Sequence, residues 1–401
     1  MINKQSSFFF ISIFFSRLAD HILLFLVPLV VYKITGSASI SGFAFFIETL
    51  PRFIWFPVAG ILSGYISPFK LLNISQLMRF CVLMLGLIGY YFIESYYWLI
   101  AISAIVGILS TQGEISREVI IPQFFKNHPL QKIFSYTQLA DQLGMVIAPL
   151  LAVLLLSVLT WDIIVAITAV LFLIADISLK LWKKYSKVIF KVNNINSMKI
   201  IDDLKVGLHN IVTIPRLLPL IVLAFSINLI LGTLLASVVP IFTGNFGESQ
   251  SEYASLQVMG IVATMIVLLI TAKFTFRLRT MGILSFVVMS TGAFLTGISD
   301  TSFIYVIGYI LIVGFDKMFN IFSRTFRSNI IPEKDFGKTI GLIVLFNNIS
   351  QPIAGLIIAT YANTIGIQPL VLYISIFAFL LGFIVFILVK VKSSNFSIIK
   401  N

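Results

Sequence analysis

The sequence predicts an all-α polytopic membrane protein with twelve transmembrane helices arranged as two six-helix bundles. Of its 401 residues, 59% are hydrophobic and 11% are charged, and the mean hydropathy is +1.03. Too little polar surface remains to cover a soluble domain of this size. Apolar runs of about 20 residues, the length that crosses a bilayer, recur along the whole chain. A short motif also recurs between the two halves.

The apolar runs divide the chain into three parts. We expect a first six-helix bundle at residues 1–182, a Lys- and Asn-rich cytoplasmic central loop at 183–215, and a second six-helix bundle at 216–401. The predicted spans are, in order, 8–32, 39–63, 71–93, 97–116, 134–158 and 162–182, then 217–243, 253–272, 281–298, 303–323, 337–361 and 367–390.

Lysine and arginine orient these spans, because the cytoplasmic loops of membrane proteins carry an excess of both residues. With both termini in the cytoplasm, all but five of the 28 Lys and Arg lie on that side; the five are Arg17, Lys33, Arg52, Arg79 and Lys317. The net charge of +12 therefore indicates orientation and not nucleic-acid binding. We expect a multi-pass monomer in the lipid bilayer of the inner (plasma) membrane, with no signal peptide removed.

An internal repeat supports the division into halves. The segment Arg117–Pro122, REVIIP, recurs 210 residues later as Arg327–Pro332, RSNIIP. Likewise, Phe15 and Ser16 near the start of the first half match Phe225 and Ser226 in the second. Two six-span halves around a midplane cavity are the architecture of many secondary transporters.

Over essentially its whole length the chain resembles the major facilitator superfamily, which implies the two-bundle fold. The family motif G-x-x-x-D-x-x-G-R-R-K follows its second span, and the segment Gly60–Lys70 matches it at Gly60 and Lys70. Because the aspartate and most basic residues are missing, the cytoplasmic latch that they supply in relatives is not expected here. The exporter pattern G-x-x-x-G-P-x-x-G appears at Gly144–Ala152, with alanine at two glycine positions.

Other short motifs narrow the resemblance. The run Thr35–Ala38 after the first span, with Glu48 and Arg52 in the second, resembles the efflux branch that contains macrolide and enterobactin exporters. More narrowly, it is similar to exporters of carboxylate-type siderophores. This resemblance implies efflux by an antiporter that works through alternating access.

Ionisable residues near the middle of the first two spans are the main site candidates. Arg17, Asp20 and His21 share one helical face of the first span. Glu48 and Arg52 stand four residues apart in the second span, in the order that favours a helical ion pair. Charges at bilayer depth mark a transport path or form a purely structural network. For transport, we expect Asp20 or Glu48 to carry a coupling proton, with His21 as a further titrating group.

Charges at the inner end of the fourth and tenth spans are candidates for a cytoplasmic gate. The repeat aligns Glu114 with Arg324, and Arg117 with Arg327. We predict that Glu114, Arg117 and Arg324 form the gate, whereas Glu118 and Arg327 mark the membrane boundary.

Polar residues in three other spans complete the predicted pathway. Side-chain amides suit hydroxyl and carbonyl ligands, although they also hydrogen-bond between transmembrane helices. In the tenth span, Asp316 and Lys317 are adjacent and point about 100° apart, so we expect each to have a separate partner. The pathway residues in these spans are Gln138, Asp141, Asp316, Lys317, Asn347, Asn348 and Gln351.

No nucleotide-binding or hydrolase motif occurs in a supporting setting, and one cysteine with three histidines provides no zinc-site pattern. We therefore predict no enzyme activity, no cofactor and no metal site. The expected function is proton-coupled secondary export of a small anionic substrate, specifically a carboxylate-type siderophore. A multidrug or macrolide antiporter is the alternative within transport, and a receptor or structural membrane protein is the alternative outside it.

Overall fold

The computed structural model describes residues 4–35, 38–93, 95–126, 128–186 and 199–398, and the regular elements in these ranges are all helices. Eleven stretches of the described helices are long and apolar enough to cross a membrane. Helix α2 (Ala38–Tyr65) occupies the position of the remaining predicted span. The predicted all-α polytopic membrane fold is therefore confirmed.

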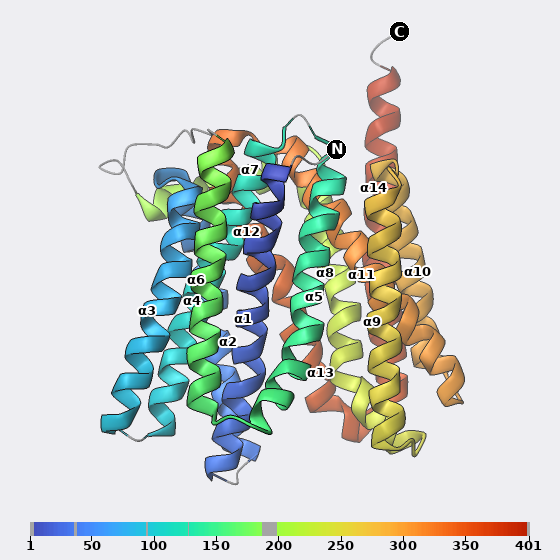
Figure 1. Cartoon of the computed structure of the whole chain (residues 1–401). Coiled ribbons are helices and arrows are strands. Elements are labelled where there is room, and N and C mark those ends of the chain that lie inside the picture. The colour runs from blue at the N-terminus through green and yellow to red at the C-terminus, as the bar shows by residue number, and fades with distance from the viewer. Residues whose placement is uncertain (1–3, 36–37, 94, 127, 187–198, 399–401) are drawn as a thin grey trace. The chain divides into compact units, whose positions relative to one another are not determined.

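Two compact units make up the chain. The first comprises Met1–Leu208 and Pro332–Leu342, and the second comprises His209–Ile331 and Ile343–Asn401. The predicted bundle limits, 1–182 and 216–401, stay a prediction. The remaining elements are α1 (Lys4–Thr35), α3 (Pro68–Ile93), α4 (Tyr96–Phe124), α5 (Leu130–Leu156), α6 (Trp161–Ser186), α7 (Ile200–Thr213), α8 (Leu217–Val239), η2 (Pro240–Asn245), α9 (Gln250–Lys273), α10 (Leu278–Ile298), α11 (Ser302–Ile330), η3 (Glu333–Asp335), α12 (Phe336–Asn348), α13 (Ser350–Ile365) and α14 (Ile367–Ile398) (Figure 1).

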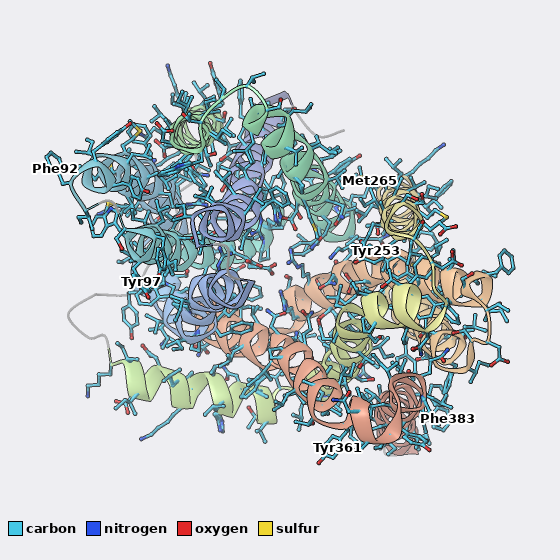
Figure 2. All side chains as sticks on the ribbon, turned by 90° about the horizontal axis from the view of Figure 1, so that it is seen from below. Phe92, Tyr97, Tyr253, Met265, Tyr361 and Phe383 are labelled. Carbon is cyan, nitrogen blue, oxygen red and sulfur yellow. The ribbon has the colours of Figure 1, made fainter. Side chains whose placement is uncertain are left out.

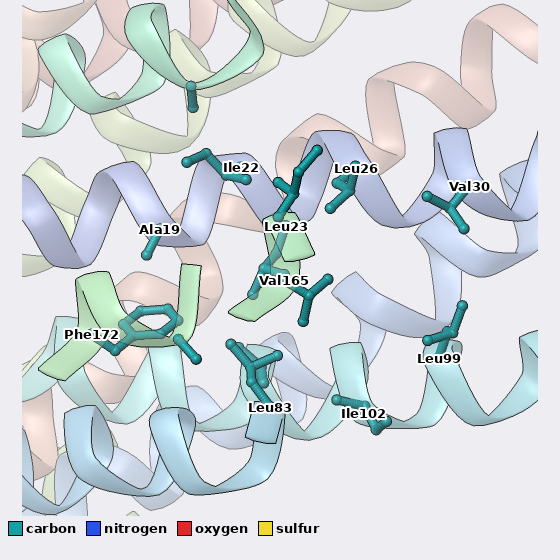
Figure 3. Packing of buried hydrophobic residues seen from close by; sticks show 14 of the residues in the cluster. Ala19, Ile22, Leu23, Leu26, Val30, Leu83, Leu99, Ile102, Val165 and Phe172 are labelled. Atoms are coloured by element: carbon teal, nitrogen blue, oxygen red, sulfur yellow. The ribbon is translucent and has the colours of Figure 1, made fainter. Parts of the chain in front are cut away.

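Helix α1 is the centre of the first unit. It packs along α5 and α6, while α3 packs on α4 and α6, and α2 packs on α4. Apolar side chains of α1 such as Leu23 and Leu26 interdigitate with Leu83 of α3 and Phe172 of α6 (Figure 3). A helix that satisfies its own backbone hydrogen bonds can bury such an apolar face in protein or lipid.

The second unit repeats this packing with its own helices. Helix α8 packs along α13 and α14, α10 packs on α11 and α14, and α9 packs on α11. These are the same neighbour relations as in the first unit, shifted along the chain, and they agree with the repeat seen in the sequence.

Large apolar side chains point outward from the helices. Phe92 is 84% exposed, and Tyr361 and Phe383 also lie on the periphery (Figure 2). Such residues would be costly on a soluble protein, but hydrocarbon is their natural surrounding in a membrane.

The predicted span 337–361 is interrupted in the structure. Helix α12 ends at Asn348 and α13 begins at Ser350, with Ile349 between them. Pro352 lacks an N–H, and its ring would clash with the carbonyl of Asn348 in a continuous helix. The hydroxyl of Ser350 donates a hydrogen bond of 2.9 Å to the Asn347 carbonyl, which stabilises the break.

Within the first unit, the start of α12 contacts α2 and α7. A Cβ on Gly60 would lie 3.0 Å from the backbone of Gly341, so this glycine permits close helix packing. Lys338 Nζ lies 2.5 Å from Asp203 Oδ1 on α7, a helix within the segment predicted as central loop. Lys338 Nζ also lies 5.5 Å from the centre of the Tyr65 ring, so this ion pair is close to the Gly60–Lys70 segment.

Candidate functional site

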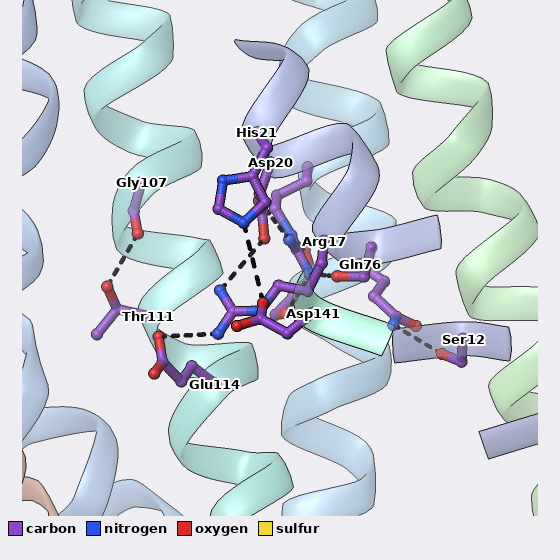
Figure 4. A network of polar contacts seen from close by, with 12 residues as sticks. Ser12, Arg17, Asp20, His21, Gln76, Gly107, Thr111, Glu114 and Asp141 are labelled. Atoms are coloured by element: carbon purple, nitrogen blue, oxygen red, sulfur yellow. Dashed lines mark hydrogen bonds and ion pairs between the residues drawn. The ribbon is translucent and has the colours of Figure 1, made fainter. Parts of the chain in front are cut away.

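Arg17 on α1 lies at the centre of a charged cluster in the first unit (Figure 4). Its Nε is 2.6 Å from Asp141 Oδ1 on α5, and its Nη2 is 3.4 Å from Glu114 Oε2 on α4. His21 Nε2 is 3.9 Å from the same Asp141 oxygen. We refer to Arg17, His21, Glu114, Asp141 and the neighbouring Arg117 as the Arg17 cluster.

Local sequence explains why α1 and α5 bring these groups together. Arg17 and His21 are four residues apart and therefore project from the same side of α1. Gly144, one turn after Asp141, has no side chain to separate the helices: a Cβ there would lie 2.9 Å from the Leu18 nitrogen. The glycine of the exporter-like pattern thus positions Asp141 against Arg17.

Arg117 stands one turn after Glu114 on α4 and is buried. Its charge interacts with those of Arg17, Glu114 and Asp141. Its Nη1 is enclosed without a hydrogen-bond partner among the described residues. The cluster therefore holds two guanidinium groups and two carboxylates, and Nη1 of Arg117 is a hydrogen-bond donor that none of the described residues accepts from.

Asp20 belongs to a second ion pair, with Arg79 of α3. Arg79 Nη1 donates a 2.9 Å hydrogen bond to Asp20 Oδ1, whereas Arg17 is 4.0 Å from the other carboxylate oxygen. The Asp20 and Arg79 side chains are only 2% and 1% exposed. Arg79 also donates to Ser16 and Ser75 and lies 4.3 Å over the Phe172 ring.

Arg79 was not among the predicted site residues, although its position within an apolar span was a sufficient signal. The sequence placed Asp20 on the same helical face as Arg17 and His21. In the structure Asp20 has a closer partner on α3, since it lies 2.9 Å from Arg79 and 4.0 Å from Arg17, whereas Arg17 lies 2.6 Å from Asp141 on α5. The interaction is thus set by helix rotation, which spacing within one helix does not specify.

Three other predicted residues of the first unit lie around these pairs. Gln138 is buried on α5, one turn before Asp141. Arg52 is partly buried on α2, and its charge interacts with Asp20 and Arg79. The side chain of Glu48 lies outside the described part of the structure, so its pairing with Arg52 stays a prediction.

In the second unit, the expectation of separate partners for Asp316 and Lys317 is wrong. Lys317 Nζ lies 2.8 Å from Asp316 Oδ2, and Asn320 donates 3.0 Å to Asp316 Oδ1. Helical directions of 100° describe Cβ positions, but the long lysine side chain curls back to its neighbour. Asp316 is thus a buried, neutralised acid.

The predicted amides of the eleventh span lie at the α12–α13 break. Gln351 Nε2 donates 2.9 Å to Oδ1 of Asn228 on α8, a residue absent from the prediction. Asn347 is buried and Asn348 is partly buried. This contact joins α8 to α13, as the Arg17–Asp141 contact joins α1 to α5. The second unit thus has a hydrogen bond between neutral amides where the first unit has an ion pair.

The predicted gate residues fall in both units. Glu114 and Arg117 belong to the Arg17 cluster of the first unit, whereas Arg324 is partly buried on α11 in the second. Their joint role as a gate stays a prediction. Among the described residues, no group of three His, Cys, Asp or Glu could hold a metal ion.

Ion pairs lie between membrane-spanning helices of the first unit, and the two units repeat one packing pattern, an arrangement typical of secondary transporters. The family model described as Major Facilitator Superfamily matches residues 9–323, and the chain belongs to this family. A search of curated proteins finds no sequence that matches the chain.

Several solved transporters share the fold. A bacterial homologue of the iron transporter ferroportin in an outward-facing state is 17% identical, with a TM-score of 0.76, covering 97% of this chain and 100% of that chain. The human organic anion transporter MFSD10 (TETRAN) is 14% identical, with a TM-score of 0.73 and coverage of 96% and 99%. The proton:xylose symporter XylE bound to 6-bromo-6-deoxy-D-glucose is 13% identical, with a TM-score of 0.68 and coverage of 94% and 95%. At these identities the likeness extends to the fold alone.

Proposed function

We propose that this transporter is a proton-coupled secondary exporter of a small anionic metabolite, of the carboxylate-type siderophore class. It acts as a monomer in the inner membrane, with both termini in the cytoplasm, as the distribution of Lys and Arg favours. The export direction rests on the short motifs shared with the efflux branch. The anionic substrate rests on the Arg17 cluster.

Two arginines in one partly accessible cluster are the observation that carries this proposal. Guanidinium groups remain charged when buried and present a planar fork that binds carboxylates with two hydrogen bonds. Arg17 is 14% exposed, and its partners Glu114 and Asp141 are 27% and 29% exposed. Arg17 and its two acids are therefore less enclosed than the Asp20–Arg79 pair, whose side chains are 2% and 1% exposed.

The same cluster disfavours two other cargo classes. A carrier of lipophilic cations would be expected to place an unpaired acid among aromatic rings, whereas each described acid of the Arg17 cluster faces an arginine. A carrier of metal ions would need several oxygen, nitrogen or sulfur ligands together, and the described residues provide no such group of His, Cys, Asp and Glu.

Arg17→Gln is expected to weaken binding of a tricarboxylate such as citrate by about 10- to 100-fold, because a charge-assisted hydrogen bond contributes roughly 1.5–3 kcal/mol. Binding to the purified protein is measured by calorimetry. Lys70→Gln is the matched control, since Lys70 is an exposed cation on α3 and should bind like the parent. Tight binding of lipophilic cations that is indifferent to Arg17→Gln would instead support the multidrug alternative.

A further inference from the structure

The two acidic residues that contact Arg17 from α1 and α5 differ in access to water. Asp20 is 2% exposed and already bonded to Arg79, whereas Asp141 and His21 are 29% and 22% exposed. A coupling group must exchange protons with water during the cycle, and the Asp20 side chain, at 2% exposed, is poorly placed to do so. This difference separates an enclosed pair, Asp20–Arg79, from a partly exposed pair, Asp141–His21.

We propose that the Asp141–His21 pair, rather than Asp20, holds the coupling proton, and that proton binding there promotes binding of the substrate anion at Arg17. This inference rests on the proposed function, since it assumes an anionic substrate. It assigns the proton to α5 and α1 together, where the sequence pointed to Asp20 or Glu48.

The charges around Asp141 come from each element that packs on α5. Helix α1 contributes Arg17, Asp20 and His21, and α4 contributes Glu114 and Arg117. On α6, the charge of Asp176 is paired with that of Lys180 at 2.7 Å, and Asp176 accepts a hydrogen bond from Asn73. The charges that remain unbalanced on protonation are therefore those of the Arg17 cluster.

Counting the charges of the Arg17 cluster shows that protonation favours anion binding. With His21 neutral, Arg17 and Arg117 balance Glu114 and Asp141, and the cluster has no net charge. One proton on Asp141 removes a negative charge, and one proton on His21 adds a positive charge. Either location leaves the cluster at +1.

The proton also frees a hydrogen-bond donor. In the resting arrangement Arg17 Nε faces Asp141 Oδ1 at 2.6 Å. When a proton from water neutralises Asp141, or when protonated His21 competes for its carboxylate, Arg17 Nε becomes available to a carboxylate oxygen of the substrate. Release of the anion returns Arg17 to Asp141 and the proton to water.

Linkage makes this effect reciprocal. If a proton strengthens anion binding, the anion strengthens proton binding by the same factor. The loaded carrier therefore contains both ligands, and the two cross the membrane in the same direction. An antiporter requires the opposite sign, in which proton and substrate exclude one another.

The experiment measures citrate binding to the purified full-length protein by calorimetry at about pH 6 and about pH 8, on either side of the ordinary titration range of histidine. Asp141→Asn fixes the cluster at +1, so at the higher pH it should bind citrate about tenfold tighter than the parent. Asp141→Asn combined with His21→Gln should show only the pH dependence of citrate itself. Asp141→Glu should retain the parental pH dependence, and Asp300→Asn, an exposed acid of the second unit, should match the parent.

The outcomes separate this inference from the proposed function. If the parent binds citrate but Asp141→Asn binds it no more tightly at the higher pH, the proton site is wrong and the anion site stands. If the double variant keeps the full parental pH dependence, the inference is also overturned. If the parent binds no citrate at either pH while remaining monodisperse, the proposed function and this inference fail together.

Discussion

Replacing Arg79 with methionine is expected to destabilise the first unit by about 3–5 kcal/mol, because Asp20 would remain buried without a counter-charge. The Arg79 guanidinium bonds to Asp20, Ser16 and Ser75, and both members of the ion pair are almost fully enclosed. Methionine preserves much of the side-chain volume and apolar contact, so the loss of stability arises mainly from removing the positive charge. The purified protein is unfolded with denaturant in detergent, and tryptophan fluorescence monitors the transition. The difference between the two unfolding curves gives the change in the free energy of unfolding.

Two variants control for this prediction. Lys70→Met removes an exposed cation from the same helix and should change stability little. Arg79→Met combined with Asp20→Leu removes both charges and should recover most of the lost stability, since a hydrophobic pair can replace a buried ion pair. Equal stability of Arg79→Met and Lys70→Met would show that Asp20 does not depend on Arg79.

Membrane potential should drive export of a tricarboxylate but not of a monocarboxylate. If one proton accompanies each anion, a trivalent anion carries two net negative charges outward and a monovalent anion carries none. Each charge gains about 2.3 kcal/mol per 100 mV, so an inside-negative potential of about 100 mV contributes roughly 4.6 kcal/mol to tricarboxylate export. The steady-state gradient should shift by about 10³-fold. Co-transport of a proton is therefore compatible with export of a polyanion.

This effect is measured in proteoliposomes that contain the substrate, with potassium gradients and valinomycin setting the potential. Tricarboxylate efflux should rise when the lumen is made negative and fall when it is made positive. Monocarboxylate efflux should not respond. A monocarboxylate that responds as strongly as the tricarboxylate would rule out one-proton co-transport.

The sequence was sufficient for the fold because hydropathy and span length are set locally by composition. It was not sufficient for the interruption at Ile349, since an apolar run does not reveal where backbone hydrogen bonds fail. Ser350 and Pro352 were visible signals of that break, but they do not lower the hydropathy of the span.

All five members of the Arg17 cluster were among the predicted site residues, but their grouping was not predicted. Arg17, His21 and Asp141 were assigned to a pathway, and Glu114 and Arg117 to a gate. These assignments followed position along the chain, whereas the contacts depend on the rotation of α1 and on the close approach that Gly144 permits.

The direction of proton movement tests the central claim most directly. Proteoliposomes hold a pH-sensitive dye, the potential is clamped at zero, and a tricarboxylate is added outside so that it enters through the transporter down its gradient. Co-transport at the Arg17 cluster should acidify the lumen in parallel with anion entry, and Arg17→Gln should reduce both signals together. Alkalinisation of the lumen as the anion enters would mean proton exchange for substrate and would contradict the account.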